Sequence, residues 1–428
     1  MRAAVVLLAC CAVVSAQEVR RAVPVVAEGT VLNDRAKFIA GIPLPETSPL
    51  AKFQSRGAYR EHSKAYEKLW MRYAEYYYWP MRQWTALEVS PRIQPGLPVF
   101  YFFGGPDSLA VRALFPDASD YILGGLEPVG GVPPPESLDP AKLEAALANL
   151  RKSTEVILSF GHFITKDMKA ELELTDLRGV VPVMMAFIVM SGGEVLELSY
   201  FGIGADGREG DFGKSERAGT KAMPGVVITF RPDAQGAPRR LRYVQADVSN
   251  DGLGKNGGLL KWAARFGEGN AYLKAASYLM HEGNFSGIRE FILGNSRAVL
   301  QDDSGIPLKY FRNENWRLWF FGTYSGTLDI FKKYYQPDMG EAFKAAGAAL
   351  PFGTGYKWKR GESNLLLAVK QEARRAEPVE PRAVVEPTPP QPVNPGAAVV
   401  EPIGPEPENT EAVVVEPRRG EPFSVPIP

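Results

Sequence analysis

The sequence has only two cysteines and three histidines among its 428 residues, and its formal net charge is zero. Both cysteines, Cys10 and Cys11, lie within the first seventeen residues. If those residues are removed, the rest of the chain can form no disulfide and no cysteine-ligated metal site, and thiol catalysis is excluded. Proteins that bind nucleic acid through long-range attraction normally carry excess positive charge, so the balanced charge argues against that class.

Several catalytic motifs are also missing. His281-Glu282 is followed by Gly283 and Asn284, so there is no H-E-x-x-H zinc motif, and neither a G-x-S-x-G elbow nor a P-loop occurs. The longest apolar run beyond the N-terminus is Val180–Met190. A run of about a dozen residues suits a buried core helix and is too short to span a bilayer. The sequence therefore predicts no transmembrane segment in the mature chain.

The N-terminus has the composition of a secretory signal peptide. Arg2 supplies a positive charge, residues 3–14 are almost all apolar, and Val14-Ser15-Ala16 offers the small residues of a cleavage site. We therefore expect residues 1–16 to be a signal peptide and the protein to be secreted or periplasmic. An alternative is a lipid anchor at Cys10, because Leu7-Leu8-Ala9-Cys10 is a weak version of the lipobox of bacterial lipoproteins.

The C-terminal part differs sharply in composition from the rest of the chain. From Ala376 to Pro428 the only aromatic residue is Phe423, and Glu-Pro dipeptides occur seven times. Proline at this density removes backbone hydrogen-bond donors, so residues 371–428 are expected to form a disordered, proline-rich and glutamate-rich tail. Val-Val-Glu-Pro recurs three times within it. Such a repeat fits a spacer, or a set of docking sites for a partner that binds extended chain.

Residues 17–96 are expected to form a helical, aromatic-rich N-terminal segment. Within residues 61–84, four aromatic residues are spaced three or four apart, as on one face of a helix. They are Tyr66, Trp70, Tyr73 and Tyr77. A buried face is favoured over an exposed sugar-binding platform, and Pro80 is expected to end or kink the helix.

Residues 97–370 are predicted to form an α/β domain. Val99–Phe103 is a continuous apolar run typical of a strand that is buried on both faces. Gly104-Gly105-Pro106-Asp107 interrupts it, a short helix is predicted over residues 109–114, and a second strand over residues 121–127. Strand, turn, helix and strand together make a βαβ unit.

This unit resembles the first half of Rossmann-type nucleotide-binding domains, including methyltransferase-like ones, in which an acidic residue ends the second strand. Glu127 stands at the matching position. The resemblance implies a layered sheet with helices on its faces. The glycine turn is not a G-x-G-x-x-G, however, and Asp107 would place a negative charge where a phosphate binds, so no nucleotide cofactor is predicted.

The rest of the domain alternates between helical and strand patterns, which favours an α/β fold. Asp139-Pro140 makes a good helix start, and a core helix is predicted over residues 180–190. Further helices are predicted at 272–280 and 288–293. Strands are predicted at 195–201, 226–230, 241–248, 298–301 and 316–321, with the second and third of these forming a hairpin.

The strongest polar cluster is Gln301-Asp302-Asp303-Ser304-Gly305, which follows a predicted strand. Ligand-binding groups of α/β sheets gather at the carboxyl ends of strands. Two adjacent carboxylates there could bind a cation, or one could act as a general base whose pKa the other raises, with His281 as a third catalytic group. The alternative is a polar turn in which Asp302 or Asp303 caps backbone amides.

A second cluster resembles the beginning of a calcium loop. Asp247, Ser249 and Asp251 have the spacing D-x-S-x-D and are followed by Gly252, so these three are candidate Ca²⁺ ligands. Gly258 stands where an EF-hand has its closing bidentate acid, and a turn after a strand would explain the same residues.

From these features we expect an exported protein of the bacterial cell envelope that binds or scaffolds rather than catalyses. An envelope protein or a polysaccharide is the expected partner, and nucleic acid is not. The alternative is a secreted hydrolase that uses Asp302, Asp303 and His281. An arrangement of these side chains around one concave pocket would favour the hydrolase.

Overall fold

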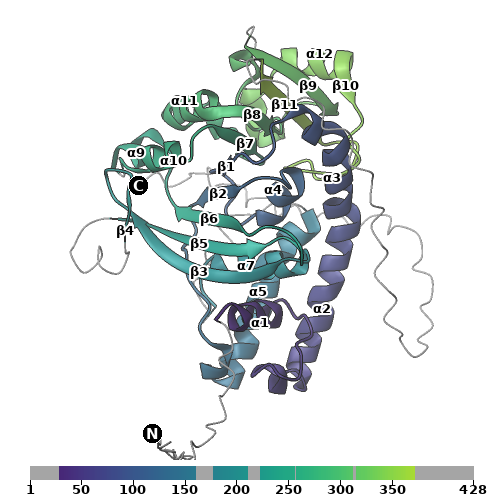
Figure 1. Cartoon of the computed structure of the whole chain (residues 1–428). Coiled ribbons are helices and arrows are strands. Elements are labelled where there is room, and N and C mark those ends of the chain that lie inside the picture. The colour runs from purple at the N-terminus through teal and green to yellow at the C-terminus, as the bar shows by residue number, and fades with distance from the viewer. Residues whose placement is uncertain (1–27, 161–176, 211–221, 256, 312–314, 372–428) are drawn as a thin grey trace, which may run out of the picture. The chain divides into compact units, whose positions relative to one another are not determined.

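The computed structural model describes residues 28–160, 177–210, 222–255, 257–311 and 315–371, all of which belong to one compact unit (Figure 1). The predicted signal peptide and nearly all of the predicted tail lie outside the described residues.

The fold is mixed α/β, with one sheet of eleven strands in the order β10-β9-β11-β8-β7-β1-β2-β6-β5-β3-β4. The strands are β1 (Val99–Tyr101), β2 (Asp120–Gly125), β3 (Glu194–Ile203), β4 (Glu209–Gly210), β5 (Met223–Arg231), β6 (Arg239–Gln245), β7 (Gly269–Leu273), β8 (Ser296–Gln301), β9 (Trp316–Gly322), β10 (Gly347–Ala348) and β11 (Asn364–Lys370).

Five neighbouring strands at the centre of this sheet are parallel: β6, β2, β1, β7 and β8. The chain moves outward from β1 to β2 and β6, and then returns to add β7 and β8 on the other side of β1. The strand order therefore reverses between β1 and β7. Strands β5 and β3 extend one edge of the sheet antiparallel to their neighbours, and β11 pairs antiparallel with both β8 and β9.

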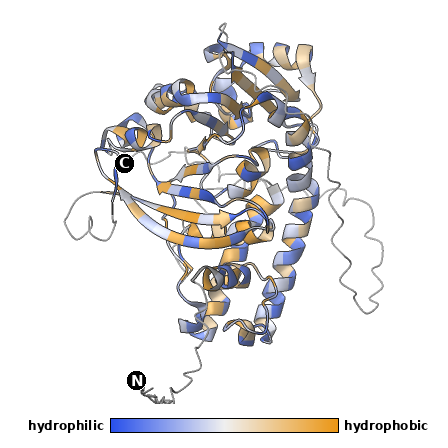
Figure 2. Cartoon of the chain, viewed as in Figure 1, coloured by the Kyte–Doolittle hydropathy of each residue, from blue (hydrophilic) through white to orange (hydrophobic). Residues whose placement is uncertain are grey.

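Helices cover both faces of the sheet. They are α1 (Glu28–Ile39), α2 (Gly57–Tyr73), α3 (Trp79–Trp84), α4 (Ser108–Leu114), α5 (Pro140–Phe160), α7 (Val181–Met190), α9 (Asn250–Lys255), α10 (Leu259–Ala264), α11 (Ser286–Asn295) and α12 (Pro337–Ala346). Strand β1 illustrates the two cores, because Val99 and Tyr101 pack with α4 and α7, whereas Phe100 packs with α10 and α11. Figure 2 shows hydrophobic residues along the central strands and a mixture of hydrophobic and hydrophilic residues on the outer helices.

The N-terminal helices share the first of these cores. Phe38 of α1 and Tyr66 of α2 belong to the same buried cluster as Val99 and Val183. Helix α7 is buried at every position, as expected for the apolar run at 180–190. Tyr66, Tyr73 and Tyr77 are buried, so these members of the aromatic set belong to the core and not to a sugar-binding platform.

The helix does not end at Pro80. Two π-helical segments, η2 (Ala74–Tyr78) and η3 (Thr85–Val89), flank α3, and the chain stays helical from Gly57 to a final 3-10 turn at Arg92. A π turn bonds i to i+5, so it tolerates the missing N–H of a proline just beyond it.

Most predicted elements of the α/β region are confirmed by the observed helices and strands, including the hairpin of β5 and β6 and the Asp139 cap, whose Oδ1 accepts from the amide of Ala141 at 2.9 Å. The helix predicted at 272–280 is wrong. Residues Gly269–Leu273 form β7, and a loop follows. A short buried apolar run does not distinguish helix from strand by its periodicity, and here the sheet core selected the strand.

Candidate functional site

The carboxyl ends of the parallel strands carry a set of buried ionisable groups, and the first pair lies where the strand order reverses. Asp107 follows β1 and Lys274 follows β7, and their side chains form an ion pair with 2% and 3% of their surface exposed. Asp107 also accepts from the Tyr101 hydroxyl at 3.1 Å and caps α4 through the amide of Ala110. The crevice in which doubly wound sheets bind ligands is thus bridged by the chain's own charges.

The glycine turn after β1 is closed in the same way. A Cβ on Gly104 would lie 2.3 Å from the Tyr101 ring, and one on Gly125, at the end of β2, would lie 2.3 Å from Glu127 Oε2. Glu127 is buried and accepts from the Tyr243 hydroxyl at 3.2 Å. The glycines therefore give room to Tyr101 and Glu127, where a nucleotide-binding loop would give room to a phosphate.

Asp302 and Asp303 lie after β8, as the sequence predicts, and both are buried. Asp302 accepts from the amides of Ala275 and Ser304, at 2.8 and 3.0 Å, and from the Ser304 hydroxyl. Asp303 accepts from the Tyr278 hydroxyl and from Asn364 Nδ2. Burial, followed by the charge of Asp303, raises the pKa of Asp302 from 3.8 to about 6.

His281 does not pair with these carboxylates. Among the described contacts, its ring packs against Tyr278 and Tyr334, with centroids 5.4 and 5.2 Å away, and its Nε2 is buried without a hydrogen-bond partner. Burial lowers the pKa of His281 to about 4, so the imidazole is neutral at pH 7. The sequence cluster therefore assembles in one region without a histidine–carboxylate hydrogen bond.

A strained loop after β7 joins these groups, and sequence reasoning missed it. Ala275, Ser277 and Tyr278 have φ angles of 50, 53 and 56°, and no other described non-glycine residue has positive φ. The loop is held from outside: Asp302 and Ser304 accept from the amides of Ala275 and Ala276, at 2.8 Å each. No glycine or asparagine marks this conformation in the sequence, so no local signal could have revealed it.

Aromatic rings surround the far side of this loop. Tyr278 stacks on Tyr334 with ring centroids 5.5 Å apart, and Phe331 packs against both Tyr278 and Tyr356. The Tyr356 hydroxyl donates to the carbonyl of Ala275 at 3.1 Å. Segments that are distant in sequence thus converge at the ends of β7 and β8.

The candidate calcium ligands have local roles. Asp247 Oδ1 accepts from the amide of Ser249 at 2.9 Å, and Ser249 Oγ accepts from the amide of Gly252 at 3.1 Å, so both stabilise the start of α9. Asp251 is exposed on that helix. Within the described ranges, no group of three or more His, Cys, Asp or Glu side chains is placed to hold a metal. Calcium binding stays a prediction.

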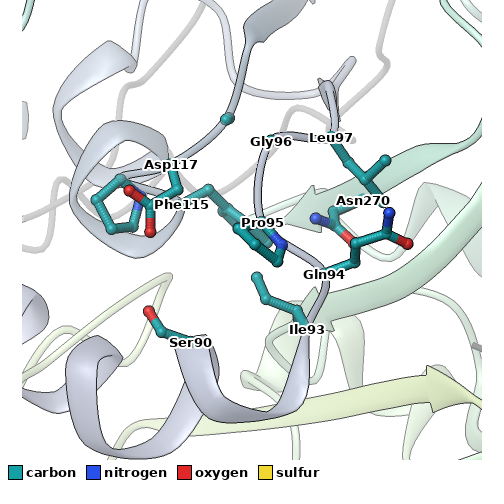
Figure 3. A pocket seen from close by; sticks show the side chains of 11 residues that line it. Ser90, Ile93, Gln94, Pro95, Gly96, Leu97, Phe115, Asp117 and Asn270 are labelled. Atoms are coloured by element: carbon teal, nitrogen blue, oxygen red, sulfur yellow. The ribbon is translucent and has the colours of Figure 1, made fainter. Parts of the chain in front are cut away.

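One pocket lies at the opposite, amino end of the parallel strands (Figure 3). Ser90, residues 93–97 and residues 115–118 form its walls, and Asn270 at the start of β7 lines it. None of the predicted site residues lies there. The described helices include none that is long and apolar enough to cross a membrane.

No family model, no curated protein and no solved structure matches this chain. Functional inference therefore depends on the residues and contacts described above.

Proposed function

We propose that the chain is a binding or scaffolding protein of the bacterial cell envelope whose α/β domain is Rossmann-like and binds its partner at the carboxyl ends of the parallel strands. The order β6-β2-β1-β7-β8 supports this proposal, because doubly wound sheets bind ligands at the switch point next to the first strand. We expect an envelope polysaccharide or an envelope protein as partner. The location outside the cytoplasm is inferred from the composition of residues 1–16.

The observation that carries the proposal is the loop Ala275–Tyr278. A non-glycine residue in the left-handed region costs about 1–3 kcal/mol, and such residues cluster at binding and catalytic sites. Ala275, Ser277 and Tyr278 all adopt this conformation within four residues. The hydrogen bonds that the amides of Ala275 and Ala276 donate to Asp302 and Ser304 keep the loop in this shape, which is the pre-organisation that a binding site needs.

Binding is favoured over catalysis because the acids at this edge are already engaged. Asp107 pairs with Lys274, Glu127 accepts from Tyr243, and the two aspartates after β8 hold the loop and Asn364. A general base must be within hydrogen-bond reach of a substrate proton. These carboxylates already accept hydrogen bonds from donors of the chain itself, which leaves them poorly placed to accept a proton from a substrate.

An exposed aromatic surface adjoins the loop and offers a contact for sugars. Tyr335 is 53% exposed and stacks on the buried Tyr324, with ring centroids 6.0 Å apart and planes 9° from parallel. The same segment contains Tyr334, which stacks on Tyr278 of the strained loop. A ring held rigidly by a second ring presents apolar area at little entropic cost.

Co-sedimentation of the full chain with purified peptidoglycan sacculi tests the proposal. We expect the wild type to sediment, and Tyr335→Ala and Ser277→Gly to remain largely in the supernatant. Glycine relieves the strain at position 277 but removes the hydrogen bond between the Ser277 and Tyr356 hydroxyls, so Ser277→Gly should release the loop from its fixed shape. Tyr200→Ala is the matched control, because Tyr200 is an exposed tyrosine on β3, outside this region.

Equal sedimentation of all four proteins would contradict the proposed location. A wild type that stays in the supernatant would exclude peptidoglycan and leave another envelope polysaccharide or a protein as the proposed partner.

The alternative function is a secreted hydrolase, and one observation favours it. The pKa of Asp302, about 6, is in the range that suits a general acid or base near neutral pH. Asp302→Asn would then abolish hydrolysis of chromogenic ester or glycoside substrates. A wild type that turns over none of these substrates would exclude hydrolysis of them.

A further inference from the structure

The long helical rod from Gly57 to Val89 has an unusual periodicity. Because two π segments lie within it, buried positions recur every four residues along its second half. They are Tyr73, Tyr77, Met81, Thr85 and Val89, all of which are buried. A regular α-helix with 3.6 residues per turn would have rotated such a series away from the core.

The same spacing keeps the opposite face of the rod in line. Positions 71, 75, 79, 83 and 87 are all exposed, and three of them carry large apolar side chains. Met71 is 59% exposed, Trp79 53% and Leu87 73%. We refer to these three residues as the outer stripe. Tyr76 beside it is also exposed, so four of the eight large hydrophobic side chains that are exposed in the described residues belong to this rod.

A line of basic side chains leads up to the outer stripe. Arg60, Lys64, Lys68 and Arg72 are spaced four apart, all are exposed, and none forms an ion pair within the described part of the chain. At about 100° per residue, Lys64 and Lys68 lie within about 60° of Met71 around the helix axis. Glu61 and Glu67 are each three positions from Lys64, and Glu75 is three positions from Arg72, so opposite charges offset the repulsion within the line.

We propose that this face of the rod docks on an anionic lipid surface. Met71, Trp79 and Leu87 would enter the boundary between headgroups and acyl chains, while Lys64 and Lys68 meet the lipid phosphates. Tryptophan and leucine on one face with lysine and arginine beside them are typical of helices that lie in the membrane interface. Tyrosine and tryptophan are enriched at that level because their rings are amphipathic.

The chemistry of the outer stripe argues against a sugar or a second copy of the chain as its binding partner. Sugars bind to the flat faces of aromatic rings, and Met71 and Leu87 offer none. A second copy of the chain would have to bury the unpaired Lys64 and Lys68 against the rod of its partner. Figure 1 shows α2 along one side of the domain. The outer stripe shares no residue with the loops that follow β7 and β8. The lipid contact is therefore independent of the function proposed above.

Flotation of the full chain with large unilamellar vesicles tests this proposal. We expect at least about tenfold more protein on phosphatidylglycerol vesicles than on phosphatidylcholine vesicles, with the difference lost at high salt because surface charges are screened. The triple variant Met71→Ser, Trp79→Ser, Leu87→Ser should lose at least about nine tenths of the binding. Lys64→Gln with Lys68→Gln should weaken it severalfold.

The matched control replaces three exposed apolar residues elsewhere: Leu126→Ser, Tyr200→Ser and Ile330→Ser. It should bind vesicles as the wild type does. If the outer triple variant fails to fold, the single variants Trp79→Ser and Leu87→Ser serve in its place. Wild type that does not float with anionic vesicles, or outer variants that float undiminished, would overturn the proposal.

Light scattering tests whether a second copy of the chain, and not a lipid surface, binds to the outer stripe. A wild type that is a dimer in solution and becomes a monomer in the triple variant would assign the outer stripe to a second copy and refute the lipid contact. Sacculus binding measured on the same triple variant should be unchanged, so failure of one proposal can be told from failure of the other.

Discussion

Removal of Lys274 should be among the most damaging single changes in this fold. Lys274→Met keeps much of the side-chain volume and leaves Asp107 buried without its counter-charge, since the carboxylate side chain is 2% exposed. The Tyr101 hydroxyl and the Ala110 amide would remain as its donors. Breaking a buried ion pair by removing one partner typically costs about 3–5 kcal/mol of unfolding free energy. Urea denaturation followed by circular dichroism measures this loss.

The second variant of the series separates the buried charge from packing. Lys274→Met combined with Asp107→Asn removes both charges, and the asparagine oxygen can still cap α4. We expect the double variant to recover most of the loss, to within about 1–2 kcal/mol of the wild type. A loss below about 1 kcal/mol in Lys274→Met would refute the reasoning, because the crevice would then admit water to Asp107. A double variant as unstable as the single one would show that packing, and not charge, is responsible.

Three further predictions concern the same region and the rod. Burial raises the pKa of Asp302 to about 6 in the folded protein, so Asp302 should make wild-type stability fall as pH rises from about 4 to 6. Burial lowers the pKa of His62 and His281 to about 4, so these two histidines should make stability rise with pH over the same window. The test therefore compares the melting temperatures of Asp302→Asn and wild type across this window. Equal pH dependence of the two proteins would contradict the prediction. Gly355→Ala should lower the free energy of unfolding by about 2–3 kcal/mol in urea denaturation, because the added Cβ would lie 2.1 Å from Asp302 Oδ2 at a φ of 68°. Gly361→Ala is the control and should lose less, because its Cβ would meet no atom within 4 Å and only the positive φ is strained. Pro80→Ala should change the melting temperature by only a few degrees, since the π turn already accommodates the proline, and a large gain would contradict this.

The sequence predicts the βαβ unit well because its signals are local. Val99–Tyr101 belongs to a continuous apolar run that lies between Pro98 and the glycines at 104 and 105. Asp139 directly precedes the helix α5, which it caps. The rod shows where local reasoning fails. A period of 3.6 residues and Pro80 predict an interruption, but the π turns change the period to four and let the buried series continue to Val89.

The candidate site is predictable in part. The position of Asp302 and Asp303 after a strand follows from the sequence, but their partners do not. Asn364 is 61 residues from Asp303, and Lys274 is 167 residues from Asp107. Such pairs depend on the strand order, which sequence spacing does not encode. The left-handed loop contains no residue type that favours its conformation. Hydrogen bonds to Asp302 and Ser304, which lie on another segment, impose that conformation instead.

Hydrogen exchange with soluble peptidoglycan fragments tests the central claim most directly. If the partner binds at the carboxyl ends of the parallel strands, peptides covering residues 274–285 and 323–336 should exchange more slowly when the fragments are present. Peptides lining the pocket at the amino ends, residues 90–97 and 115–118, should be unaffected. Protection of the amino-end pocket with none at the loops would contradict the account.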